Sequence, residues 1–99
     1  MWLAWFDAKK ASAFGISIAE YFAQRVPPTS LRATDAKLSR NLAEVTSSLH
    51  TQAELFRMEH KPNIYKTAKL ANSFQWKLFD LGYDKGFVED LTKKLLRNF

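Results

Sequence analysis

The side chains that could do chemistry in this 99-residue chain are two histidines and a row of hydroxyls in its middle third. His50 and Glu54 stand four residues apart and share one helix face, but no motif supplies the further ligands of a metal site. His60 falls near a helix end, where a cationic imidazole is favoured. The plainer interpretation is a solvated pair at His50 and Glu54 and a capping group at His60, so we expect no metal ion and no cofactor.

Catalysis by a nucleophile requires a serine, threonine or cysteine activated by a neighbouring base. The hydroxyls lie within a predicted helix, where no strained turn exposes them, and the Gly-x-Ser-x-Gly motif is missing. The absence of cysteine excludes thiol catalysis, disulfides and cysteine-ligated metal sites. Only three glycines are present, too few for a phosphate-binding loop, and the segment 82–86 indicates a turn. We expect no catalytic residues and a protein that is not an enzyme.

Composition is that of an ordinary globular chain, with 46% hydrophobic and 25% charged residues. We expect a single helical domain over residues 1–99. Charges at Asp7, Lys9 and Lys10 interrupt the N-terminal apolar run, and no run is long enough to span a bilayer. We therefore expect a cytoplasmic protein.

Three breaks divide the chain, at Pro27-Pro28, at Pro62 and at Gly82. Between them the apolar residues recur with the period of a helix, because they follow spacings of three and four. This pattern predicts helices near residues 3–26, 30–61, 63–82 and 84–98. We expect an all-α, four-helix domain built from two antiparallel helical hairpins.

The apolar faces of these helices predict how they pack. In the first helix the face is small at Ala8, Ala11 and Gly15, which predicts a closely approaching partner helix. The second helix carries a narrow stripe typical of a bundle, formed by Leu31, Leu38, Leu42, Val45, Leu49, Ala53 and Phe56. Around Gly82 we predict a Schellman turn, followed by Asp84 as the N-cap of the last helix.

Several aromatic residues fall outside these stripes, on helix faces that the fold does not obviously use. Trp5 and Phe6 lie beside the main face of the first helix, and Trp76, Phe79 and Tyr83 form a second cluster on the third. Aromatic side chains are enriched at the centres of protein interfaces. The favoured function is therefore a small interaction or scaffolding protein that forms a homodimer or binds a protein partner through Trp5, Phe6, Trp76 and Phe79.

The alternative is a nucleic-acid-binding protein, since the chain has a net charge of +5 and residues 63–99 carry seven Lys+Arg against four Asp+Glu. Lys66 and Lys69 project near Trp76, and cations beside an aromatic ring can hold phosphates and stack bases. A solvated lysine face is the plainer interpretation. Binding to a membrane surface is disfavoured, because the first helix is rich in alanine and poor in lysine. No small-molecule substrate is evident.

The segment from His60 to Trp76, followed by Gly82-Tyr-Asp84 and Phe87-Val-Glu-Asp-Leu91, resembles a group of small bacterial helical proteins with no known activity. The likeness covers about the last forty residues, with a fainter echo in residues 14–22. The resemblance implies a bacterial, cytoplasmic helical protein and carries over no site residue.

Overall fold

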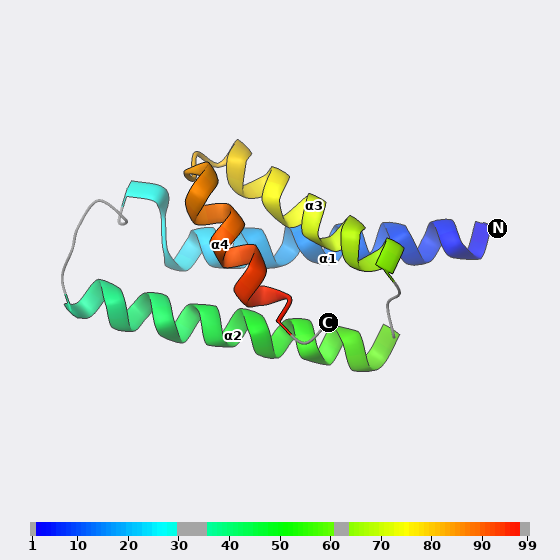
Figure 1. Cartoon of the computed structure of the whole chain (residues 1–99), viewed down its shortest axis with the longest axis horizontal. Coiled ribbons are helices and arrows are strands. Elements are labelled where there is room, and N and C mark those ends of the chain that lie inside the picture. The colour runs from blue at the N-terminus through cyan, green and yellow to red at the C-terminus, as the bar shows by residue number, and fades with distance from the viewer. Residues whose placement is uncertain (1, 30–35, 61–63, 98–99) are drawn as a thin grey trace.

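The computed structural model describes residues 2–29, 36–60 and 64–97, with the side chains of residues 9–29, 40–59 and 65–97. Over these residues it contains four α-helices and no strand, which confirms the all-α prediction. The helices are α1 (Trp2–Arg25), α2 (Ala36–His60), α3 (Ile64–Asp80) and α4 (Lys85–Leu95). The molecule measures 48 × 24 × 19 Å, and α1 and α2 lie along its long axis (Figure 1).

The predicted helix ranges agree with α1 and α3 to within two residues at each end. The predicted start of the second helix, at residue 30, lies outside the described residues. The last helix begins one residue later than predicted and ends at Leu95, before the predicted end at residue 98, which lies outside the described residues. The chain leaves helical dihedrals at Leu96, where φ is −98° and ψ is 14°, although the amide of Leu96 still donates to the carbonyl of Thr92 at 3.0 Å.

The most extensive contact between helices joins α1 to α3, which are not neighbours in the chain. Gly15 makes this contact possible. A Cβ at Gly15 would lie 2.5 Å from the carbonyl oxygen of Leu70 and 3.1 Å from the amide nitrogen of Phe74. The predicted close partner of the small face is therefore α3. Two antiparallel hairpins would pair α1 with α2 and α3 with α4, whereas the most extensive contact joins α1 to α3. The arrangement as two hairpins therefore stays a prediction.

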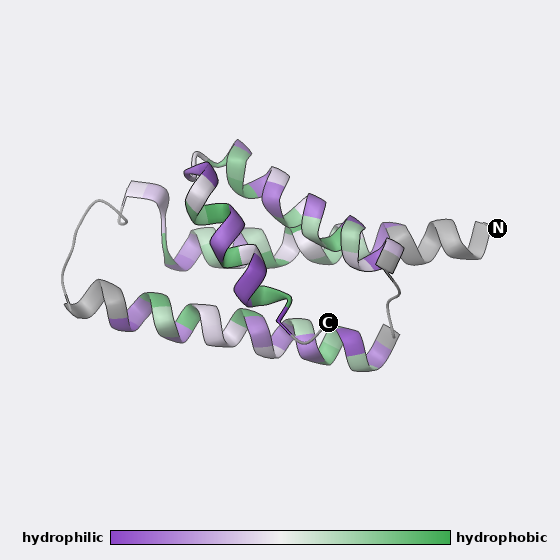
Figure 2. Ribbon diagram, in the orientation of Figure 1, coloured by the Kyte–Doolittle hydropathy of each residue, from purple (hydrophilic) through white to green (hydrophobic). Residues whose placement is uncertain are grey.

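The hydrophobic core lies where these helices meet. Hydrophobic residues recur at intervals along α1, α3 and α4, as expected for helices with one buried face (Figure 2). Each of the four helices contributes buried side chains, and the largest that are fully buried are Phe22, Phe74, Ile18, Leu49, Leu70, Leu78, Leu95, Val26 and Val88. The core therefore depends on all four helices rather than on one pair.

The α2 helix buries the predicted stripe from Val45 to Phe56. The ring of Phe56 stacks on that of Phe14 from α1, with centroids 4.4 Å apart and an interplanar angle of 11°. The hydroxyls of Tyr21 and Ser48 add a hydrogen bond of 2.9 Å between the same helices. The predicted stripe residues Leu31 and Leu38 lie outside the described side chains.

The turn between α3 and α4 has the predicted Schellman geometry. Gly82 has a φ of +99°, a conformation that residues with a Cβ rarely adopt. The amide of Tyr83 donates to the carbonyl of Leu78 at 3.1 Å, and the amide of Gly82 to that of Phe79 at 3.0 Å. Asp84 is the N-cap of α4, as predicted, and its carboxylate accepts a hydrogen bond of 3.2 Å from the amide of Phe87.

Tyr83 is a core residue, which corrects its assignment to an outer aromatic cluster. Its side chain is 5% exposed and lies against Phe22 and Phe87, with ring centroids 5.6 and 5.9 Å away. Its hydroxyl donates a hydrogen bond to the carbonyl of Val26. Tyr83 thereby joins the turn before α4 to the end of α1. Helical projection places Tyr83 beside Trp76 because it ignores the turn, which redirects the chain at Gly82.

Replacing Gly15 with alanine should lower the free energy of unfolding by about 1–3 kcal/mol, because the new methyl group would meet a backbone carbonyl that moves only with α3. Urea denaturation followed by circular dichroism measures the change. Gly86→Ala is the comparison, since its new Cβ would meet no backbone atom outside its own helix within 4 Å: the one near atom is the capping carboxylate oxygen of Asp84 at 3.2 Å, which needs to move by only a few tenths of an ångström and without moving a helix. Equal stability of the wild type and Gly15→Ala would contradict the packing described.

Replacing Tyr83 with phenylalanine should lower the free energy of unfolding by about 1–2 kcal/mol, because the buried carbonyl of Val26 loses its hydrogen-bond donor. Chemical denaturation near neutral pH measures this loss. Tyr65→Phe is the matched control. Tyr65 is 57% exposed, so loss of its hydroxyl should leave the free energy of unfolding nearly unchanged.

The same tyrosine predicts a pH dependence. Burial raises the pKa of Tyr83 to about 12, above the value of about 10 for an unfolded chain. The protonated phenol is therefore favoured in the folded state. Its contribution is fully present below pH of about 10 and is lost as the pH rises through about 12. Denaturation curves across this window should show a smaller loss for Tyr83→Phe than for the wild type, and parallel losses would refute the assignment.

Candidate functional site

Trp76 is the most exposed large hydrophobic residue among the described side chains, with 72% of its surface open to solvent. Its ring meets that of Phe79 edge to face, with centroids 6.5 Å apart and an interplanar angle of 84°. Phe79 is half-buried and packs against the core. The predicted interface residues Trp76 and Phe79 are therefore together, with one ring held by the core and the other in solvent.

An open hollow of about 550 Å³ surrounds Trp76 at the junction of α1 and α3. Ser12 and Ile16 come from α1, and Ile16 is 40% exposed. The remaining lining residues come from α3 at spacings that place them on one helix face. We call this set the α3 outer face: Lys69, Asn72, Ser73, Trp76, Lys77 and Asp80. It lies to one side of the residues that α3 buries, Leu70, Phe74 and Leu78, and its inner edge meets α1, because Ser73 is half-buried beside Gly15.

Charges of both signs lie on the α3 outer face. The ammonium of Lys69 lies 5.7 Å from the centroid of the Tyr65 ring, within the range of a cation–π contact. Asp80 is exposed at the other end of the face. Within the described part of the chain, Asp80 makes no ion pair. The face therefore has Lys69 at one end, Lys77 and Asp80 toward the other, and Trp76 between them.

The structure brings together two of the three residues of the nucleic-acid hypothesis. Lys69 and Trp76 of the nucleic-acid hypothesis share the hollow, whereas Lys66 is half-buried and does not line it. Lys77 lines it, although the sequence did not single it out. Trp5 and Phe6 belong to α1, but their side chains lie outside those described.

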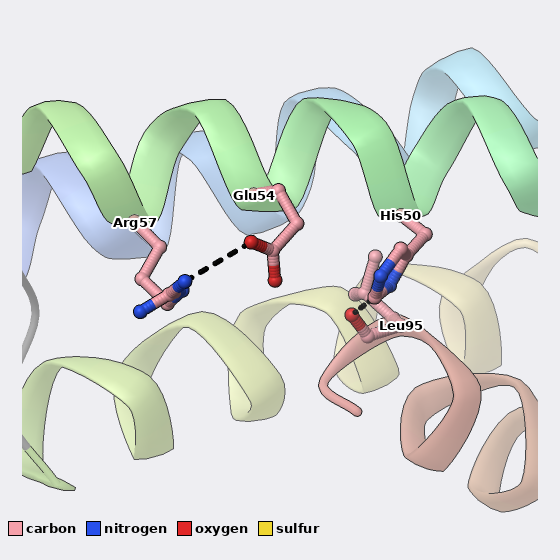
Figure 3. A network of polar contacts seen from close by, with 4 residues as sticks. All are labelled: His50, Glu54, Arg57 and Leu95. Carbon is pink, nitrogen blue, oxygen red and sulfur yellow. Dashed lines mark hydrogen bonds and ion pairs between the residues drawn. The ribbon is translucent and has the colours of Figure 1, made fainter. Parts of the chain in front are cut away.

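His50 and Glu54 do not form the solvated pair that the sequence suggested. His50 Nδ1 lies 3.3 Å from the carbonyl oxygen of Leu95 at the end of α4, and Glu54 instead pairs with Arg57 at 3.1 Å (Figure 3). Because a carbonyl only accepts, Nδ1 carries the hydrogen of this bond. Forty-five residues separate His50 from Leu95, so no local pattern could have predicted the contact.

A second hollow, of about 500 Å³, lies beside this histidine between α2 and the end of α4. Its lining is polar and basic at one side and apolar at the other: Leu42, Ala43, Thr46, Ser47, His50, Lys94 and Arg97. The row of hydroxyls on α2 is visible in the sequence, but its proximity to Lys94 and Arg97 is not. Only the return of α4 across α2 brings these groups together.

The part of the chain that the structure describes offers neither a metal-binding cluster nor a membrane-spanning helix. No group of three or more histidine, aspartate or glutamate side chains there could hold a metal ion. None of the helices has a stretch that combines the length and the apolar character needed to cross a membrane. The chain matches no family model, no curated protein and no solved structure.

Proposed function

We propose that this protein is a small non-enzymatic interaction protein that self-associates through the α3 outer face. One observation carries the proposal: Trp76 is 72% exposed at the centre of this face, although tryptophan is among the most favourable residues to bury. A partner that covers Trp76 and Ile16 would remove apolar surface from water. Tryptophan is also among the residues that contribute most to binding at interfaces.

The charges of the α3 outer face favour a second copy of the chain as the partner. Two α3 helices can pair antiparallel about a two-fold axis midway between Ser73 and Trp76. Lys69 of each copy then faces Asp80 of the other, which gives two favourable pairs by symmetry. The same register places the large ring of Trp76 over the small side chain of Ser73, which is half-buried beside Gly15, so the ring would also meet α1 of the other copy. A face with one sign of charge would repel itself in this arrangement.

We also propose that the domain consists of two antiparallel helical hairpins, in which α1 pairs with α2 and α3 pairs with α4. Support comes from the tight capped turn at Gly82 and from the hydrogen bond between Tyr21 and Ser48. In such an arrangement α1 and α3 form the junction between the hairpins. The hollow around Trp76 lies along this junction, where a second copy would contact both hairpins at once.

Replacing Trp76 with alanine should weaken self-association at least roughly tenfold, because it removes the central apolar contact. Sedimentation velocity over a concentration series measures the dissociation constant. Met58→Ala is the matched control, since Met58 is 67% exposed on α2 and lies outside the face. Both variants should keep the wild-type melting temperature. A wild-type protein that stays monomeric at the highest concentrations would overturn the proposal.

Charge reversal tests the antiparallel register. Lys69→Asp or Asp80→Lys alone should weaken the dimer, because each places like charges opposite one another twice. The double variant Lys69→Asp/Asp80→Lys should recover most of the wild-type affinity, since it exchanges the two ends of the face. Failure of the double variant to recover, with the single variants folded, would exclude this register.

Nucleic-acid binding remains the second candidate, favoured by the position of Lys69 and Lys77 on either side of Trp76 in one hollow. Asp80 in the same hollow opposes it, because a carboxylate repels phosphates. The hypothesis with Lys66, Lys69 and Trp76 expects labelled single-stranded DNA to bind at low salt. Fluorescence anisotropy should then show a slope of roughly −1.4 in log affinity against log salt for two phosphate contacts. A flat slope, or no binding at low salt, would reject this candidate.

A further inference from the structure

The hollow between α2 and the end of α4 is independent of the α3 outer face and shares no residue with it. Its volume of about 500 Å³ falls in the range of sites for small organic molecules. The hydrogen bond from His50 to the Leu95 carbonyl holds the end of α4 against α2 at this place. Leu49 and Leu95 are fully buried beside it, so the two walls of the hollow rest on the core.

The charged residues that line this hollow, among those the structure describes, are all of one sign. Lys94 and Arg97 stand at its α4 side, and no described carboxylate lines it. Asp90 lies one turn away on α4 and pairs with Lys94 at 3.3 Å, but both side chains are more than half exposed, and such pairs are weak. Arg97 makes no ion pair within the described part of the chain. An anion could therefore bind the Arg97 guanidinium without displacing an ion-pair partner among the described residues.

The α2 side of the hollow supplies hydrogen-bond donors and an apolar wall. The hydroxyls of Thr46 and Ser47 line it and make no side-chain hydrogen bond with the other described residues. Leu42 and Ala43, one turn earlier, provide apolar surface. The Nδ1 hydrogen of His50 is already donated to the Leu95 carbonyl, so it is not available to a ligand. The hollow thus combines two cations, two hydroxyls and an apolar wall.

We infer that this hollow binds a small organic anion, a phosphate or carboxylate group carried on an apolar body. Arg97 and Lys94 hold the charged group, with the guanidinium offering paired donors. Thr46 and Ser47 donate to its remaining oxygens, and the apolar body lies against Leu42 and Ala43. This combination disfavours inorganic phosphate, which would leave the apolar wall uncovered, and a neutral ring, which would leave the cations without a partner.

Amide NMR titrations of the full chain test the inference with four probes. Phenyl phosphate and phenylacetate should give saturable shifts at Thr46, Ser47 and Arg97, and the tighter of the two identifies the charged group. Phenol, with the ring alone, and inorganic phosphate, with the charge alone, should bind at least roughly tenfold more weakly than the tighter of the two. No saturable shift with either organic anion, or equal binding of inorganic phosphate, would overturn the inference.

Matched charge variants separate the site from the general attraction of a basic protein. Arg97→Gln and Lys94→Gln should each weaken binding of the better probe roughly three- to tenfold. Lys85→Gln removes the same charge at the opposite end of α4 and should change the affinity less than about twofold, because salt screens a distant charge. Equal weakening by all three variants would overturn the inference. Dimerisation by Trp76 is measured separately, so failure of either proposal leaves the other intact.

Discussion

The close approach of the α1 and α3 backbones at Gly15 is the constraint on which the rest of this structure depends. Only glycine fits at this position without a shift of the backbone, because a Cβ would lie 2.5 Å from the carbonyl oxygen of Leu70. The contact sets the rotation of α3 about its own axis, since Leu70, Phe74 and Leu78 must then point into the core. Trp76 follows Phe74 by two residues, or about 200° of helix rotation, and therefore points to solvent. One glycine on α1 thus helps to decide which face of α3 is available to a partner.

A second set of contacts returns the chain to α2. The turn at Gly82 reverses the direction after α3, and the buried hydroxyl of Tyr83 ties that turn to the Val26 carbonyl. The α4 helix then crosses toward α2, where the Leu95 carbonyl meets His50 (Figure 1, Figure 3). This return brings Lys94 and Arg97 to the hydroxyl-bearing face of α2. Both hollows are therefore consequences of how the helices are placed, and neither lies within a single helix.

The two surfaces differ in chemistry. The α3 outer face is built around an exposed aromatic ring, with Lys69 at one end and Lys77 and Asp80 toward the other, and these charges of both signs permit pairing with a copy of itself. The hollow at α2 and α4 carries cations, and no carboxylate among the residues with described side chains lines it, which suits a small anion. Because they share no residue, a ligand in one need not compete with a partner on the other. A protein that pairs through one surface could present two copies of the second.

Local patterns determined the four helices, the small face at Gly15, the buried stripe of α2, and the cap and turn around Asp84, because each depends on neighbouring residues along the chain. Trp76 could be predicted as a spare aromatic for the same reason, since the main stripe of its helix is complete without it. Only the tertiary structure decided that α3 is the partner of Gly15, that Tyr83 is buried, and that His50 meets Leu95 rather than Glu54. The contacts of Gly15 with α3, of the Tyr83 hydroxyl with Val26 and of His50 with Leu95 join residues at least 45 positions apart, and a helical projection holds no information about which distant segment packs on a face.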